Sequence, residues 1–188
     1  MSSPVPAGQR TYRAAAPWQQ AIRRLSALRP VSRVMALALP YLDPAVSGLT
    51  RGRHTLTGIM TGLTVAELTT TGSVSGRPRK VRLLGFPMED GFVVIASNFG
   101  RTRHPAWYHN LLTQPQAELA VHGRSQRVVA ELTTGRRRAQ LWKRALTFFP
   151  GWREYQGRQE SREIGVFLLS AQTDPAADSR HQPRPGPG

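Results

Sequence analysis

The sequence predicts an α+β fold that is mainly β, in which about six antiparallel strands close into a barrel with peripheral helices and a helical N-terminal extension. Apolar and β-branched runs between residues 63 and 170 alternate with short turns that contain Gly or Pro, as in consecutive hairpins. Sheets built from consecutive hairpins are usually antiparallel and often close into barrels. The length of 188 residues suits one such domain with extensions.

Turn residues separate the expected strands from one another. The strands are residues 64–72, 79–88, 92–98, the two arms of a hairpin over 117–134 that turns at Gly123, and 164–170. The first two are joined by "SVSGRP", whose Gly and Pro are typical of a hairpin turn, and the second and third by the tight turn "EDG".

Helices are expected between these strands. Pro105 begins a short helix that ends near Leu112, at a position where the missing N–H of proline costs little. Residues 134–150 form a helix with Thr134 as its cap, and its inward-facing residues are Leu141, Ala145 and Phe148. Residues 151–163 form a short helix or a loop.

Composition divides the chain into four parts. We expect residues 1–16 to be a flexible N-terminus, residues 17–60 a helical extension, residues 61–170 the barrel domain and residues 171–188 a disordered tail rich in Pro. In the extension, a helix over 18–28 carries Ile22, Leu25 and Leu28 on one face, with Arg23 and Arg24 elsewhere. A second helix covers residues 32–39.

The charge of the chain is strongly positive, because 26 Lys and Arg face 11 Asp and Glu, for a formal net charge of +15. Such a surface attracts phosphates, carboxylates, nucleic acid and anionic lipid. The two basic N-terminal helices either lie on an anionic membrane surface or simply cover the domain.

No apolar run approaches the ~20 residues of a membrane span. We therefore expect a cytoplasmic protein, with a peripheral position at the inner face of the cell membrane as the alternative.

Several kinds of chemistry are disfavoured. The absence of Cys excludes thiolate metal sites, Fe–S clusters and a Cys nucleophile. The motifs G-x-S-x-G, Walker A, G-x-G-x-x-G and H-E-x-x-H are missing. His104 and His109 are five residues apart with no carboxylate close by, so no metal site is expected.

Large polar and aromatic residues gather in "SNFGRTRHPAWYHNLLTQP", residues 97–115, where an apolar strand ends and a helix begins. One interpretation is nucleic-acid binding, because Arg and aromatic side chains on a sheet neutralise phosphates and stack on bases. The other is a small-molecule pocket at the barrel rim for a flat, anionic ligand. The Trp and Tyr residues fall in helices and connectors rather than along strand faces, so we favour the pocket and expect no nucleic-acid partner.

Four stretches, "AELTTTG", "SGRPRKVRLLGF", "GFVVIASNFGRTRHPAWYHNLLTQP" and "FPGWREYQ", together resemble the deazaflavin-dependent nitroreductase and quinone reductase family, whose members use coenzyme F420. The resemblance runs from about residue 66 to residue 169, and "HPAWYHNLLTQP" is its most specific part. It implies a split β-barrel related to the FMN-binding split barrels. It also implies reduced F420 as the hydride donor, and a quinone or nitroaromatic compound as the acceptor.

The resemblance further implies cofactor-binding positions in the first hairpin, at the end of the third strand and at the start of the following helix. They are Ser73, Val74, Ser75, Arg79, Lys80, Val81, Arg82, Leu83, Leu84, Ile95, Ala96, Ser97, Asn98, Ala106, Trp107, Tyr108, His109 and Asn110. Relatives commonly carry basic residues where this chain has Ser73, Val74 and Asn98. Strand alternation places Arg79 and Lys80 on opposite faces, so the basic side chains of the hairpin cannot all contact one phosphate.

On the acceptor side, the resemblance implies that Phe149, Trp152 and Tyr155 close over the substrate. Phe149 and Trp152 have no hydroxyl, so Tyr155 and Ser97 are the candidate catalytic acids for the developing oxyanion. We expect Trp107 to pack structurally rather than to stack on the ring. The alternatives are an FMN or haem user on the same barrel, a non-catalytic binder of F420 or a tetrapyrrole, and a nucleic-acid-binding module.

Overall fold

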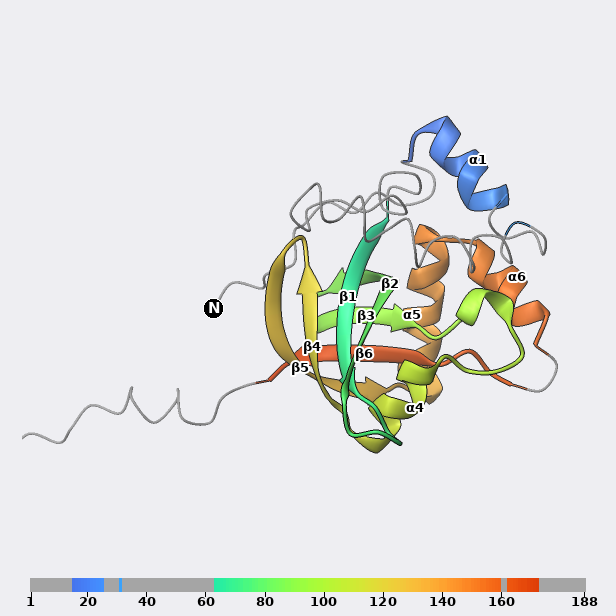
Figure 1. Cartoon of the computed structure of the whole chain (residues 1–188). Helices are drawn as coiled ribbons and strands as arrows, with labels where there is room; N and C mark the ends of the chain where they lie inside the picture. The colour runs from blue at the N-terminus through green and yellow to red at the C-terminus, as the bar shows by residue number, and fades with distance from the viewer. Residues whose placement is uncertain (1–14, 26–30, 32–62, 160–161, 173–188) are drawn as a thin grey trace, which may run out of the picture.

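The computed structural model describes residues 15–25, 31, 63–159 and 162–172, and its central feature is a closed barrel of six antiparallel strands (Figure 1). The strands are β1 (Thr64–Thr71), β2 (Pro78–Met88), β3 (Gly91–Ile95), β4 (Gln116–Val121), β5 (Arg124–Leu132) and β6 (Val166–Ala171). Their order around the barrel is β1-β2-β3-β6-β5-β4, and β4 pairs with β1 to close it. The predicted fold class and the number of strands are confirmed.

Strand β6 is last in the sequence but lies between β3 and β5. Its antiparallel register pairs Val166 with Ile95 of β3 and Leu169 with Ala130 of β5. The end of β3 therefore lies next to the start of β6, and the amide of Ala96 continues the ladder by donating to Gly165 O at 2.9 Å. This pairing brings two distant connecting segments to the same edge of the barrel.

Two apolar clusters lie on the two faces of the sheet. One fills the barrel interior and includes Leu68, Leu119 and Phe167, each almost completely buried. The other lies on the outer face of β2, β3 and β6 beneath helix α5 (Gly135–Phe148). As the sequence predicts, Leu141, Ala145 and Phe148 are the buried residues of this helix.

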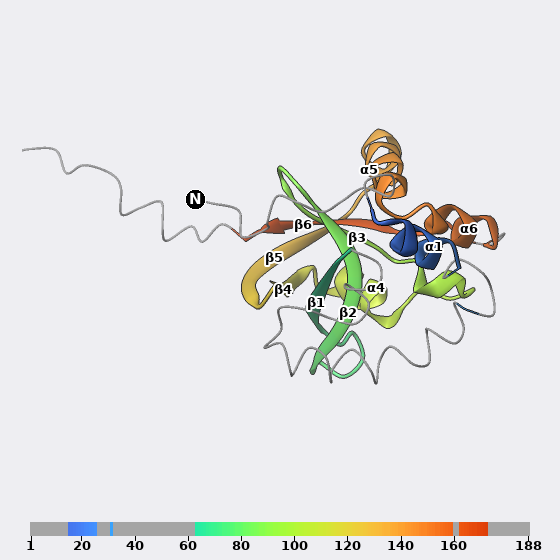
Figure 2. The same ribbon diagram turned by 90° about the horizontal axis from the view of Figure 1, so that it is seen from above.

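Helix α4 (Ala106–Thr113) covers one end of the barrel, at the bottom of Figure 1 and beneath the barrel in the view from above (Figure 2). Its buried residues Trp107 and Leu111 join the interior cluster, and the Trp107 ring packs against Phe167 with centroids 5.8 Å apart. The expectation that Trp107 packs structurally is therefore confirmed. Residues 151–163 were expected to form a short helix or a loop. Their first half forms the short helix α6 (Gly151–Gly157).

The first helix of the extension, α1 (Pro17–Leu25), lies beside α5 and α6 in both ribbon views (Figures 1 and 2). Arg23 is 1% exposed and its Nη1 donates to Phe148 O at 2.7 Å, whereas Leu25 is 53% exposed. The side chain of Arg23, which the sequence places off the apolar face, is therefore buried, and Leu25 on that face is exposed. A guanidinium reaches the C-terminal carbonyls of α5, where a positive charge is favoured.

Among the strands, the largest difference from the predicted boundaries is at the end of β3, which ends at Ile95 and not at Asn98. Residues Asn98–Gly100 form a short 3-10 turn, η1, that leaves the barrel toward α4. The expected second helix over 32–39, Leu28, the N-terminal residues 1–14 and the tail from 173 onward lie outside the described residues. Within the described part of the chain, no helix combines the length and the apolar character that a membrane span needs.

Candidate functional site

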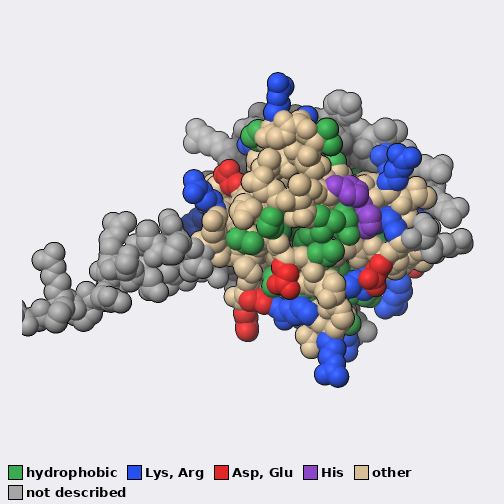
Figure 3. All heavy atoms as spheres, turned by 90° about the horizontal axis from the view of Figure 1, so that it is seen from below, with side chains coloured by type: hydrophobic (Ala, Val, Ile, Leu, Met, Phe, Trp, Pro, Cys, Tyr) green, Lys and Arg blue, Asp and Glu red, His purple; other side chains and the backbone are tan. Residues whose placement is uncertain are grey.

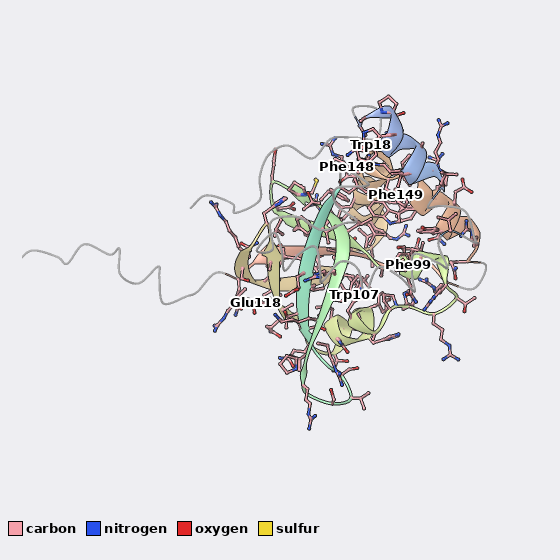
Figure 4. The ribbon with its side chains drawn as sticks, turned by 45° about the horizontal axis from the view of Figure 1, so that its top comes forward. Trp18, Phe99, Trp107, Glu118, Phe148 and Phe149 are labelled. Atoms are coloured by element: carbon pink, nitrogen blue, oxygen red, sulfur yellow. The ribbon has the colours of Figure 1, made fainter. Side chains whose placement is uncertain are left out.

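A cavity of about 1340 Å³ lies outside the barrel, against β1 and β2, between the β1–β2 turn, the β3–α4 connector, the start of α4 and helix α6. Figure 4 shows three of its wall residues, Phe99, Trp107 and Phe149, on the same side of β1 and β2. These three residues come from three different segments. The volume exceeds that of an ordinary small-molecule pocket, which is ~300–1,000 Å³.

The β1–β2 turn forms one end of this cavity. Gly72 is buried, and a Cβ there would come within 2.6 Å of Ser75 Oγ, while Gly76 has a φ of 63° that favours glycine. Among the described residues, the amides of Val74 and Ser75 make no hydrogen bond, and Val74 is fully exposed. The turn therefore presents free N–H donors to an anion.

Asn110 of α4 links the turn to the helix. Its Oδ1 accepts a hydrogen bond from the amide of Ser73 at 3.0 Å, and its Nδ2 donates to Thr70 Oγ1 at 2.9 Å. Asn110 and Thr70 are both buried. The side chain of Asn110 is thus occupied in holding two walls of the cavity together.

A carboxylate in the cavity wall offsets part of the positive charge of β2. Glu67 lies directly across from Arg82 in the β1–β2 register, and it contacts Lys80 at 3.1 Å and Arg82 at 3.5 Å. Arg79, on the opposite face by strand alternation, instead donates to Ser75 Oγ at 3.5 Å. Nη1 of Arg82 is buried without a hydrogen-bond partner among the described residues.

The start of α4 forms a further wall. Its N-cap residue, Pro105, makes no side-chain cap, so the first amides, those of Ala106 and Trp107, have no capping partner in the described structure. An anion at this helix terminus would receive both N–H groups and the favourable end of the helix dipole.

His104, immediately before α4, stacks on Tyr108 with ring centroids 3.8 Å apart. Burial lowers the pKa of His104 below its usual value of 6.5, and the charge of Arg162 and the neighbouring His109 lower it further. The imidazole is therefore neutral at pH 7, and its Nδ1 lies 3.2 Å from Nη1 of Arg162.

Three aromatic residues at the end of α5 and on α6 close the cavity on the other side. Phe149, Trp152 and Tyr155 are each less than 5% exposed, and the Phe149 ring packs against Trp152 at 5.4 Å and Tyr155 at 6.1 Å. They belong to the apolar cluster under α5 and also line the cavity. Burial raises the pKa of Tyr155 to about 12, although Arg158 over its ring acts in the opposite direction.

The structure brings nearly all of the predicted site residues to this cavity. Nineteen of them line it; the two that do not are Ala96 and Tyr108. Ala96 is fully buried in the barrel cluster, and Tyr108 turns its ring toward His104 and Phe167. Further lining residues that were not among the predicted site residues are Val65, Glu67, Thr70, Gly72, Phe99, His104 and Pro105. Of these, Val65 and Glu67 follow from alternation along β1, once the outer face is known to carry the site.

At the end of the barrel that carries α4, the side chains of the described residues form no continuous basic surface (Figure 3). Hydrophobic side chains gather near its centre with His beside them, and Lys and Arg side chains are interspersed with Asp and Glu. This face differs from the basic stripe typical of nucleic-acid-binding proteins. Within the described residues, no group of three or more His, Asp or Glu could hold a metal ion.

The cavity fits a ligand that combines a flat ring with negatively charged groups. Its apolar floor includes Val65, Leu84 and Ile95, which suits an aromatic ring. The free amides of the turn and of α4, together with the guanidinium of Arg82 in the cavity wall, suit phosphate or carboxylate oxygens. A tricyclic deazaflavin with a phosphodiester and a glutamate tail has this combination of groups.

The fold is a closed barrel, and the cavity at its rim has a lining suited to a planar, anionic ligand. A model of the F420H(2)-dependent quinone reductase family matches residues 47–171, two thirds of the chain, and the chain belongs to this family. An F420H(2)-dependent quinone reductase of Mycobacterium tuberculosis is 34% identical over 95 residues, which make up 50% of this chain and 62% of that protein. The chain thus spans less than two thirds of the length of this relative.

Two solved structures share the fold. The structure of an F420-H2 dependent reductase, FDR-A, has a TM-score of 0.52 and 30% identity, and covers 56% of this chain and 93% of its own. A second structure, described as a domain-swapped dimer, has a TM-score of 0.55 and 28% identity, and covers 75% of this chain and 99% of its own.

We predict that Asn110→Ala loosens the β1–β2 turn. Two hydrogen bonds are lost and the buried Thr70 hydroxyl keeps no partner on α4, so the free energy of unfolding should fall by about 1–3 kcal/mol. Urea denaturation and amide exchange at Ser73 measure this. Thr113→Ala, an exposed position on the same helix, is the control and should change stability by less than about 0.5 kcal/mol. Equal stability and equal Ser73 exchange in both variants would contradict the prediction.

We predict that Tyr155 stays protonated in the folded protein at pH values where an ordinary tyrosine ionises. With a pKa of about 12 it should be ionised by only about 3% at pH 10.5. The unfolded chain, with a tyrosine pKa near 10, releases this proton first, so the contribution to stability is complete below pH 10 and is lost as pH rises above it. Phenolate absorbance of the native protein, compared with Tyr155→Phe, gives the midpoint. A midpoint near 10 would show that burial does not act on this group.

Proposed function

We propose that the protein is an F420H2-dependent oxidoreductase that reduces a quinone, with nitroaromatic compounds as alternative acceptors. The observation that carries this proposal is the cavity, where free amides, Arg82 and three aromatic residues surround one apolar floor. Membership of the F420H(2)-dependent quinone reductase family supports F420 as the ligand of this cavity.

The chain's own groups would bind the cofactor at two ends. The turn amides at Val74 and Ser75 and the first amides of α4 would receive the anionic tail, while Leu84 and Ile95 would pack against the ring. Glu67 would hold Arg82 in place in the cavity wall through its ion pair. Fewer cations surround this tail site than in relatives, because Ser73, Val74 and Asn98 are uncharged.

When bound, the reduced deazaflavin supplies a hydride to the acceptor. Phe149 and Trp152 would hold the acceptor's ring in a space from which water is excluded. The acceptor also needs a proton at its developing oxyanion. Tyr155 and Ser97, which both line the cavity, are the two candidate hydroxyl donors for that oxygen.

Mixing the purified protein with reduced F420 and menadione tests this proposal. We expect the visible absorbance of oxidised deazaflavin to develop at a rate proportional to protein concentration. Tyr155→Phe should lower kcat by about 10²–10⁴-fold if its hydroxyl is the main acid, with little change in F420 affinity. Ser97→Ala tests the other donor, and Ser125→Ala, on the exposed side of β5, is its control.

Three other outcomes would contradict the proposal in different ways. Tight F420 binding without oxidation by any quinone or nitro acceptor would identify a non-catalytic binder. Purification with a bound flavin or haem that F420 does not displace would identify another cofactor. Absence of F420 binding altogether would remove the basis of the proposal.

We also propose that α1 docks on an anionic membrane surface, which would bring the cavity near lipid-soluble quinones. Trp18 and Leu25, seven residues apart on one face, are 52% and 53% exposed, and Arg24 beside them is exposed as well. Exposed Trp and Leu flanked by Arg are typical of helices that lie in the lipid interface. The net charge of +15 adds attraction to anionic headgroups.

Sedimentation with vesicles measures this docking. We expect binding to phosphatidylglycerol vesicles that weakens with salt, little binding to phosphatidylcholine vesicles, and at least a threefold loss in a Trp18→Ser and Leu25→Ser double variant. Val129→Ser, an exposed apolar position on β5, is the control. Equal sedimentation of the double variant and the control would contradict docking through α1.

A further inference from the structure

The connector between β3 and α4 has an unfavourable backbone. Three consecutive residues, Asn98, Phe99 and Gly100, have φ values of 48°, 56° and 74°. Residues other than glycine seldom adopt such conformations, and they persist only where the surrounding structure fixes them. Ser97, Asn98 and Phe99 line the cavity, so whatever fixes this connector also shapes the cavity wall.

A single guanidinium binds most of the connector from outside the cavity. Arg162, which precedes β6, donates to four backbone carbonyls. The acceptors are the carbonyl oxygens of Ala96, Ser97, Arg101 and Thr102, at 3.4, 3.3, 2.7 and 3.0 Å. Nη1 also contacts Nδ1 of His104 at 3.2 Å. The planar fork of arginine allows one side chain to reach acceptors on both sides of the strained turn.

A second side chain binds Gly100, the residue that follows Asn98 and Phe99 in the turn. Gln159 is 7% exposed, and its Nε2 donates to Gly100 O at 2.6 Å. Gly100 lies against Tyr155, because a Cβ on this glycine would come within 3.1 Å of the tyrosine Cδ1. The connector is therefore fixed in contact with the candidate acid on α6.

The backbone around Arg162 is in turn anchored to α6. Nε2 of Gln156 donates to Arg162 O at 3.1 Å, and Oε1 of Gln156 accepts from the amide of Ile164 at 2.8 Å. The ladder bond from Ala96 N to Gly165 O fixes the same segment to the end of β3. The backbone of Arg162 is thus bound to α6, while its side chain binds the end of β3 and the connector.

We propose that Arg162, assisted by Gln159, is a positioning residue that holds residues 96–104 in the conformation that receives F420. Arg162 does not line the cavity, so it acts through the connector and not by touching the ligand. The inference rests on the proposed function for the identity of the ligand. The hydrogen bonds that hold the connector do not depend on it.

The test uses Arg162→Gln, Arg162→Lys and Gln159→Leu in the full chain, with Arg136→Gln, an exposed arginine of α5, as the control for lost charge. Hydrogen–deuterium exchange of peptides over residues 96–104 should be at least tenfold faster in all three variants. Peptides from β4 and β5 should exchange as in the wild type. Fluorescence titration should give at least a tenfold higher Kd for F420 in Arg162→Gln.

The lysine variant separates charge from geometry. Arg162→Gln removes the nearby positive charge, so the pKa of His104, followed by NMR, should rise toward 6.5, while burial keeps it below that value. Arg162→Lys keeps the charge and should leave this pKa low, yet one ammonium cannot satisfy four carbonyls, so the connector should still exchange faster.

Several results would overturn the inference. The inference would be overturned if residues 96–104 exchanged hydrogen at the same rate in Arg162→Gln as in the control Arg136→Gln. It would also be overturned if exchange became equally faster in β4 and β5, because that result would indicate general destabilisation. Unchanged F420 affinity in Arg162→Gln, with a wild type that binds F420, would also overturn it. If the wild type failed to bind F420, the proposed function would fall, and the exchange and His104 measurements would still decide whether Arg162 fixes the connector.

Discussion

The antiparallel pairing of β3 with β6 determines where the site can form. The two strands are 70 residues apart in sequence, yet the register pairs Ile95 with Val166. The chain leaving β3 and the chain entering β6 therefore lie side by side at one edge of the barrel. The first carries the cavity wall from Ser97 to His104, and the second carries Arg162. Helix α6 belongs to the same arrangement, because Gln156 binds the segment that enters β6.

The opposite side of the cavity depends on a smaller set of contacts. Helix α4 closes the end of the barrel with Trp107 and Leu111, and Asn110 on the same helix holds the β1–β2 turn. The two ends of the cavity that are proposed to bind anions, the turn amides and the N-terminus of α4, are therefore fixed relative to each other. Charge within the cavity is more balanced than the net charge of +15 suggests, because Glu67 contacts Lys80 and Arg82.

Short-range sequence patterns correctly predicted the features that depend on neighbouring residues, namely the strands and the buried face of α5. Turn residues separated the six strands, and the inward face of α5 followed from the spacing of Leu141, Ala145 and Phe148. The concentration of polar and aromatic residues in 97–110 pointed to the site. The resemblance to a known family supplied the predicted cofactor positions on β2 and the predicted substrate positions on α6. Composition alone would not have indicated them.

Features that depend on pairing distant segments were missed. Glu67 lies in the cavity wall beside Arg82 because the β1–β2 register pairs the two residues. Arg162 lies beside the connector because β6, which it precedes, pairs with β3. Tyr108 was placed at the cofactor because the motif surrounds it, but packing against His104 and Phe167 turns it away. Arg23 was expected away from the packed face, and its hydrogen bond to the end of α5 buries it instead.

A crystal structure of the protein with F420 would test most directly whether the cavity is a cofactor site. The deazaflavin ring should lie over Leu84 and Ile95, beside Ser97, with the anionic tail between the β1–β2 turn and the start of α4. The aromatic residues of α6 should face the ring from the other side. Density for F420 inside the barrel, or on any surface that excludes the turn and α4, would contradict this arrangement.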